Sequence, residues 1–166
     1  MARNVEIQAR LANHPFLVGM SPLQIEVLAS CASSRQFQEG EVIFRAGEPA
    51  NGFYLIEEGS VAIEEWVPEG GTTIIETLYA GEPLGWSWIF PPYTWHFLAR
   101  ATSPTAALFF NGMTLHRFCN EDLTLGHELF KRMSQVMVRR LQSCRAKLIE
   151  ALKPTSTPIA DPRPEQ

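Results

Sequence analysis

The sequence predicts a mainly β protein, a sandwich or barrel of short strands with helices on either side. Between Phe37 and Phe110, short runs rich in β-branched and aromatic residues alternate with turn residues. A capped helical pattern precedes this region, and a long amphipathic helical pattern follows it. Regular alternation of short strands and turns is typical of sandwiches and barrels.

Length and composition limit the protein class. The 166 residues suffice for one domain of ordinary size, and a content of 45% hydrophobic against 19% charged residues favours a packed core over a disordered chain. No apolar run approaches the roughly 18 residues that cross a bilayer, and the N-terminus lacks a signal peptide pattern. We therefore expect a cytoplasmic protein with no membrane partner.

The first element is a helix over about residues 21–32. Ser21 is a good cap, Pro22 suits the first helical position, and Gln24 completes a capping box. The β region then predicts strands at residues 42–44, 53–56, 61–63, 73–78, 97–101 and 106–110. Pro68 to Gly71 reads as a hairpin turn, because paired glycines accept the positive φ of tight reversals.

After Gly112 the pattern is helical again, and its apolar residues follow one another at spacings of three or four. They are Phe130, Met133, Met137, Leu141, Cys144, Leu148 and Leu152. Such a stripe packs on the domain itself or on a second copy. Its length exceeds what one small barrel covers, so we expect a helix at about 128–152 that forms a homodimer through Met133, Met137, Leu141 and Leu148. The proline-rich residues 153–166 are expected to be a disordered tail.

Glycine spacing carries the most specific signal. Gly40, Gly47 and Gly59 bracket strand-sized runs that include Ile43-Phe44 and Tyr54-Leu55-Ile56. In this order the stretch resembles the cyclic nucleotide-binding domain, whose pattern is Gly-x-x-Ile-Phe-x-x-Gly followed by an aromatic-Tyr-x-Ile run and Gly-x-Val. The resemblance implies a β jelly roll, a double-stranded β-helix, with a long C-terminal helix over residues 14–152.

The resemblance extends to two further segments. Gly81-Glu82-Pro83-Leu84-Gly85 lies where that family begins its phosphate-binding cassette, and residues 133–142 resemble the dimerisation helix of the catabolite activator and Fnr regulator branch. In that branch a helix-turn-helix DNA reader follows the helix, whereas here a short proline-rich segment follows. We therefore expect a stand-alone regulatory sensor domain and no direct DNA binding.

The cassette departs from the family pattern at its polar positions. A buried cyclic phosphodiester needs an arginine fork and backbone N–H groups, and a carboxylate takes the ribose hydroxyl. Trp86 replaces that glutamate, and Trp95 or His96, depending on the direction of counting, replaces the phosphate arginine. Residues 39–82 hold ten glutamates and one basic residue, Arg45. No cofactor is therefore assigned, and binding of cyclic AMP in the usual mode is disfavoured.

The replacements are mostly aromatic, since half of residues 86–97 are phenylalanine, tyrosine or tryptophan. Three interpretations stay open: the rings fill the old pocket, they hold a flat apolar ligand with Ser87 and His96 as polar groups, or some form a surface for another protein. A protonated His96 could also take an anion, with binding that falls as pH rises. The candidate ligand-binding residues are Leu84, Gly85, Trp86, Ser87, Trp88, Trp95, His96 and Phe97, with Arg140, Cys144 and Arg145 on the helix side.

Other chemistry is not indicated. The four histidines and three cysteines have no metal-ligand spacing, and Gly85-Trp86-Ser87 lacks the second glycine of a nucleophile elbow, so no enzyme or metal site is expected. Residues 114–153 hold eight basic and four acidic residues, which leaves a regulator that acts with a separate DNA-binding partner as a weak alternative. The other alternative is an interaction module with a plugged pocket and an unknown protein partner.

Overall fold

The computed structural model describes residues 2–153 of the chain. These residues divide into two compact units, one that ends at Met133 and one that begins at Ser134. The expected disordered tail lies outside the described residues, apart from Lys153. None of the described helices is long and apolar enough to cross a membrane.

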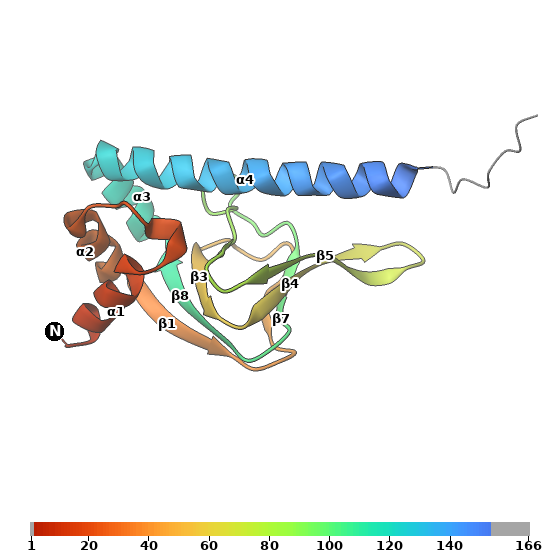
Figure 1. Ribbon diagram of the computed structural model, residues 1–166, viewed down its shortest axis with the longest axis horizontal. Helices are drawn as coiled ribbons and strands as arrows, with labels where there is room; N and C mark the ends of the chain where they lie inside the picture. The colour runs from red at the N-terminus through yellow and green to blue at the C-terminus, as the bar shows by residue number, and fades with distance from the viewer. Residues whose placement is uncertain (1, 154–166) are drawn as a thin grey trace, which may run out of the picture. The chain divides into compact units, whose positions relative to one another are not determined.

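The first unit is built on two four-stranded antiparallel sheets, which confirms the mainly β prediction (Figure 1). The strands are β1 (Ala32–Phe37), β2 (Val42–Phe44), β3 (Gly52–Glu58), β4 (Ser60–Val67), β5 (Gly71–Tyr79), β6 (Pro83–Leu84), β7 (Leu98–Ala101) and β8 (Thr105–Asn111). One sheet has the order β1-β8-β3-β6 and the other β2-β7-β4-β5. This exchange of strands between two sheets is the arrangement of a jelly roll.

Register in the first sheet places large apolar residues opposite one another. Phe53 pairs with Phe110 and Leu55 with Leu108 across β3 and β8, and all four are at most 1% exposed. The interior between the sheets is a cluster of buried apolar residues. Its members are Phe44, Ala50, Ile56, Val61, Ile63, Leu78, Leu84, Trp95, Phe97 and Ala99, with Ile43, Tyr54 and Trp86 packed against them.

Helices of the first unit flank this core. They are α1 (Ala2–Ala12), the 3-10 helix η1 (Pro15–Leu17), α2 (Pro22–Ser30), α3 (Gly112–Glu121) and the start of α4 (Leu123–Leu152), which continues into the second unit. The predicted capping box is present in α2: Ser21 Oγ accepts from Gln24 N–H at 3.2 Å, and Gln24 Oε1 accepts from Ser21 N–H at 2.9 Å. The helix ends at Ser30, earlier than predicted, because β1 begins at Ala32.

The β4–β5 hairpin confirms the turn predicted at Pro68 to Gly71, but the residues that adopt positive φ differ from those predicted. The positive φ angles belong to Glu69 (65°) and Gly71 (70°), not to the pair of glycines. The hairpin is long and extends beyond the rest of the two sheets (Figure 1). Its outer part is apolar on the surface, since Trp66 is 67% exposed and Ile74 57%.

The second unit consists of the later part of α4, from Ser134 to Leu152. Helix α4 begins with Asp122 Oδ1 accepting from the N–H groups of Thr124 and Leu125 at 2.9 and 3.1 Å. It begins five residues before the predicted start at 128, because Asp122 caps it directly after α3. Large apolar residues on the second unit stay exposed, among them Leu141 at 70% and Leu148 at 59%.

Candidate functional site

The predicted cassette is the loop of residues 85–97, here named the cassette loop, which joins β6 to β7. Its second half is fixed by backbone hydrogen bonds to residues 47–50. Gly47 N–H donates to Trp95 O at 2.8 Å, Trp95 N–H to Glu48 O at 2.9 Å, and Ala50 N–H to Tyr93 O at 2.7 Å. These hydrogen bonds fix the backbone position of Trp95, because its N–H donates to the Glu48 carbonyl and its own carbonyl accepts from Gly47 N–H.

Trp95 points into the interior between the two sheets. Its ring stacks on Phe44 with centroids 3.8 Å apart and planes 10° apart, and it is 3% exposed. A Cβ added to Gly85 would lie 2.6 Å from Trp95 Cζ3, closer than real Cβ contacts come. The space beside Gly85 is therefore occupied by an indole ring, and Gly85, with φ +90°, admits no larger residue there without strain.

Two further cassette rings belong to the same interior cluster. Phe97 is 9% exposed and lies 5.7 Å from the Phe44 ring, and Trp86 meets Phe97 edge-on at 5.7 Å. Leu84 is fully buried in the cluster. The structure thus brings together Leu84, Gly85, Trp86, Trp95 and Phe97 around Phe44.

Trp88 belongs to a different group of rings, although it comes from the same loop. It stacks on Phe53 at 5.7 Å and meets His116 edge-on at 5.1 Å, and Phe130 lies 6.2 Å away. Its neighbour Ser87 is 3% exposed. Within residues 2–153, the Oγ of Ser87 and the Nε1 of Trp88 are buried without a hydrogen-bond partner. The other two loop rings face outward, with Phe90 54% and Tyr93 46% exposed.

The candidate cationic groups lie elsewhere. His96 is exposed. Arg100, on β7, donates from Nε to Glu64 Oε1 at 3.0 Å and from Nη1 to the Gly40 carbonyl at 3.0 Å. Its guanidinium therefore neutralises the carboxylate of Glu64, which is 8% exposed, and stays outside the interior cluster. The hydrophobic cluster around Trp95 includes none of these cationic groups among the described residues.

The residues predicted on the helix side all lie in the second unit. Arg140, Cys144 and Arg145 are on α4 beyond Ser134, and the Cys144 thiol is exposed. Their place beside the cassette stays a prediction. Of the predicted dimer residues, Met133 is buried, Met137 is partly buried, and Leu141 and Leu148 are exposed.

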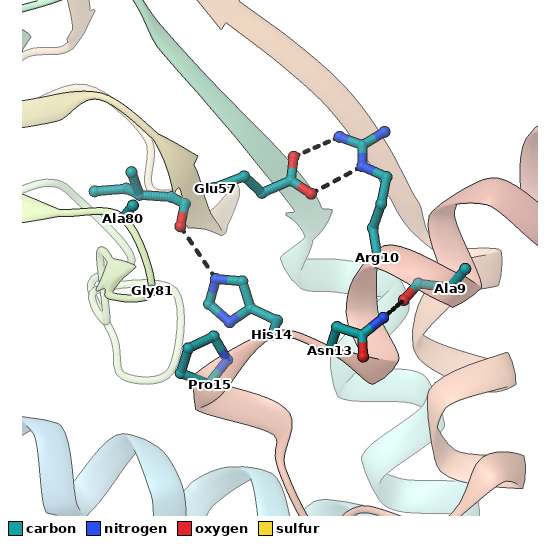
Figure 2. Close-up of a pocket in the computed structure, with 9 residues that line it drawn as sticks. Ala9, Arg10, Asn13, His14, Pro15, Glu57, Ala80 and Gly81 are labelled. Atoms are coloured by element: carbon teal, nitrogen blue, oxygen red, sulfur yellow. Dashed lines mark hydrogen bonds and ion pairs between the residues drawn. The ribbon is translucent and has the colours of Figure 1, made fainter.

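A second set of polar residues, which sequence reasoning did not identify, lines a crevice of about 540 Å³ between α1 and the barrel (Figure 2). The Arg10 guanidinium forms a two-point ion pair with the Glu57 carboxylate. His14 is 5% exposed; its Nδ1 accepts from Phe16 N–H at 3.2 Å, and its Nε2 donates to the Ile56 carbonyl at 3.1 Å. Burial lowers the pKa of His14, so the neutral ring with a proton on Nε2 is the form that fits here.

Sequence reasoning also missed Phe44 as the partner of Trp95. The signal was present, because the Ile-Phe pair of the glycine pattern places that ring on β2. What the sequence could not supply was the pairing of the cassette loop with residues 47–50. The isolated bridge between Pro49 and Thr94 brings the two segments together.

Comparison with known proteins agrees with this architecture. Residues 34–122, about half of the chain, match the model of the cyclic nucleotide-binding domain. A protein from Geobacter metallireducens described as cyclic nucleotide-binding is 25% identical, with a TM-score of 0.72 over 81% of this chain and 97% of that one. The sensor domain of the transcriptional regulator DNR from Pseudomonas aeruginosa, 24% identical over 86% of this chain and 95% of its own, has the same fold with a TM-score of 0.68.

A match of another kind is the acetyltransferase Pat of Mycolicibacterium smegmatis, which is 34% identical over 77 residues, or 46% of this chain. The matched segment is 23% of that acetyltransferase, so the chain spans less than a quarter of its length. The match to the family model, the jelly-roll sheets and the similarity to these solved structures agree with one another. The chain belongs to the cyclic nucleotide-binding domain family.

Proposed function

We propose that this chain is a regulatory domain whose nucleotide cavity is filled by its own aromatic side chains, so that cyclic AMP is not bound in the usual mode. The observation that carries the proposal is the Trp95 ring, which stacks on Phe44 and lies against Gly85. A nucleotide could enter only if this ring left. Since Trp95 is buried among apolar neighbours, expelling it would forfeit roughly 3–5 kcal/mol of packing.

Electrostatics support the same conclusion. A cyclic phosphodiester would bring a negative charge into a cluster of apolar side chains. Arg100 is the arginine nearest in sequence to the cassette loop. Its guanidinium already donates to the Glu64 carboxylate and to the Gly40 carbonyl. Moving it to a ligand would leave a buried carboxylate without its partner, which is strongly unfavourable.

Calorimetric titration of the purified chain with cyclic AMP and cyclic GMP tests this proposal. We expect no saturable heat at about pH 8.5 or about pH 6. Stoichiometric binding at the higher pH would overturn the proposal. Binding only at the lower pH that is lost in His96→Ala would assign the anion to a protonated imidazole and would equally contradict a filled cavity.

Regulation then operates through contacts with other protein chains, and we propose that the first partner is a second copy. Support comes from the exposed apolar positions on the second unit, Val138, Leu141, Leu148, Ile149 and Leu152. Such a stripe is stabilised when a like helix covers it.

The mass of the particle in solution tests the dimer. We expect a dimer by sedimentation for the native chain and a monomer for Leu141→Glu combined with Leu148→Glu. The matched control is Gln142→Glu, which adds a carboxylate at an exposed, polar position of the same helix. A native monomer, or a dimer that survives both leucine replacements, would contradict this assignment.

A further inference from the structure

A cavity of about 380 Å³ lies outside the filled interior, between the cassette loop and the start of α3. Its walls include Asn51, Trp88, Tyr93, Asn111, Met113 and His116. The volume falls within the range of roughly 300–1,000 Å³ that small-molecule sites occupy. The cavity is therefore large enough for a small ligand without any rearrangement of the Trp95 cluster.

Three aromatic rings form the cavity's apolar side. The His116 ring meets Trp88 edge-on at 5.1 Å with planes 66° apart, and it meets Tyr93 at 6.0 Å with planes 78° apart. Trp88 is 1% exposed, so its ring is covered by the protein's own side chains, whereas Tyr93 is 46% exposed and offers an open face. Rings held at such angles present faces and edges against which a flat molecule can stack.

Hydrogen bonding defines one acceptor at the same place. His116 Nε2 lies 2.9 Å from the Trp88 carbonyl oxygen, which can only accept, so the proton is on Nε2. Nδ1 of the neutral ring is then an acceptor that a ligand can use. The Nε1–H of Trp88 is unpartnered in this part of the chain, but it is enclosed and takes no part in the contact with a guest.

The lining also excludes charged ligands, because none of the residues that form it is an aspartate, glutamate, lysine or arginine. Burying an ion without a counter-charge is costly, so an uncharged guest is favoured. We propose that this cavity binds a small, uncharged, planar heteroaromatic molecule whose N–H group donates to His116 Nδ1 and whose ring stacks against Tyr93.

Occupancy would connect two elements of the first unit. Trp88 and Tyr93 belong to the cassette loop, whereas Gly112, Met113 and His116 belong to α3. A guest that contacts both holds the loop against the helix that leads, through the cap at Asp122, into α4. This site is independent of the filled nucleotide cavity, so either proposal can fail without the other.

Indole and 1-methylindole are the matched probes, because they share the same fused ring system and only indole has an N–H group. Titration into isotope-labelled protein should give saturable amide shifts at Asn51, Gly112 and His116 with indole. We expect 1-methylindole to bind about three- to tenfold more weakly, as the loss of one hydrogen bond implies. Equal affinity for the two probes would overturn the assigned donor, and no saturable shift, or shifts centred on Gly85 and Trp95, would overturn the site.

Two variants locate the guest. Tyr93→Gly removes one ring while suiting the positive φ of 55° at that position, and it should weaken indole about three- to tenfold. The control Phe90→Ala removes another exposed ring of the same loop that does not line the cavity, and it should leave affinity unchanged. Met113→Trp, at a residue 83% exposed, should block the cavity without destabilising the fold. Unchanged affinity in both Tyr93→Gly and Met113→Trp would refute the proposal.

Discussion

Trp95 and Trp88 come from one loop and are equally well buried, 3% and 1% exposed, yet their surroundings differ. Trp95 stacks tightly on Phe44 within an apolar cluster. Trp88 stacks loosely on Phe53, carries an unpartnered N–H group, and forms a wall of a cavity. The difference shows that burial of a ring does not reveal whether a site is filled. The stacking distance separates these two rings where burial does not.

The strongest test of this contrast is Trp95→Ala. Removing the ring leaves a large void between the sheets, so the free energy of unfolding should fall by about 3–5 kcal/mol. Urea denaturation measures it, with Trp66→Ala as the control, because Trp66 is 67% exposed and its loss should change stability by no more than about 0.5 kcal/mol. Equal effects for the two variants would mean that the interior is not tightly filled.

A somewhat smaller effect is expected for Gly85→Ala. Both Gly85 and Gly47 have positive φ, 90° and 84°, but a Cβ on Gly47 would have nothing within 4 Å. Gly47→Ala therefore measures backbone strain alone, about 1–2 kcal/mol. Gly85→Ala adds the collision with the Trp95 ring and should cost about 1–3 kcal/mol more in the same denaturation experiment. If the two variants are equally stable, Trp95 does not press on Gly85 in solution.

On the other side of the contrast, Trp88→Phe should have a small effect. The replacement loses ring area, but it also removes a buried N–H group without a partner, and the second change offsets the first. We expect a change of less than about 1 kcal/mol in the free energy of unfolding. A loss as large as that of Trp95→Ala would show that the Nε1–H is bonded in solution.

The smallest effect should come from acidification, which leaves the apolar cluster around Trp95 unaffected and acts on His14. Because burial lowers the pKa of His14 in the folded protein, the unfolded chain takes up the proton first. Its contribution to stability is complete above the usual histidine pKa of about 6.5 and is lost as pH falls below that value. Denaturation midpoints at about pH 7.5 and about pH 5 should therefore differ less in His14→Gln than in the native chain. His127→Gln, at an exposed histidine, should keep the native pH dependence.

Local signals account for the elements that the sequence predicts. The capping box of α2 and the strands of the two sheets depend on short-range patterns of polar caps, turn residues and β-branched runs. Strand β6 has only two residues and exists because Leu84 and Pro83 pair with Tyr54 and Leu55 on β3. No local pattern marks such a strand, since its partners lie almost thirty residues away in the chain. Helices α1 and η1 and strand β1 were likewise not predicted.

The sequence predicts which residues belong to the candidate site, but not how their side chains are oriented. It identifies a cassette loop with aromatic residues in place of polar ones, but the order of residues along a loop does not determine which ring points into the interior. That choice is made by the pairing of residues 93–95 with 47–50, and by Gly112, where a Cβ would lie 3.3 Å from that of Trp88. The chain therefore separates neighbouring tryptophans into different environments through contacts that are distant in sequence.

The distribution of the four tryptophans also gives the molecule a built-in optical reporter. Trp86, Trp88 and Trp95 all belong to the cassette loop and are buried or partly buried, whereas Trp66 stands in solvent on the β4–β5 hairpin. A water-soluble quencher such as iodide should quench the fluorescence of Trp66 first and leave the blue-shifted emission of the three tryptophans in the cassette loop. What remains of the fluorescence then follows this one segment, without any added label.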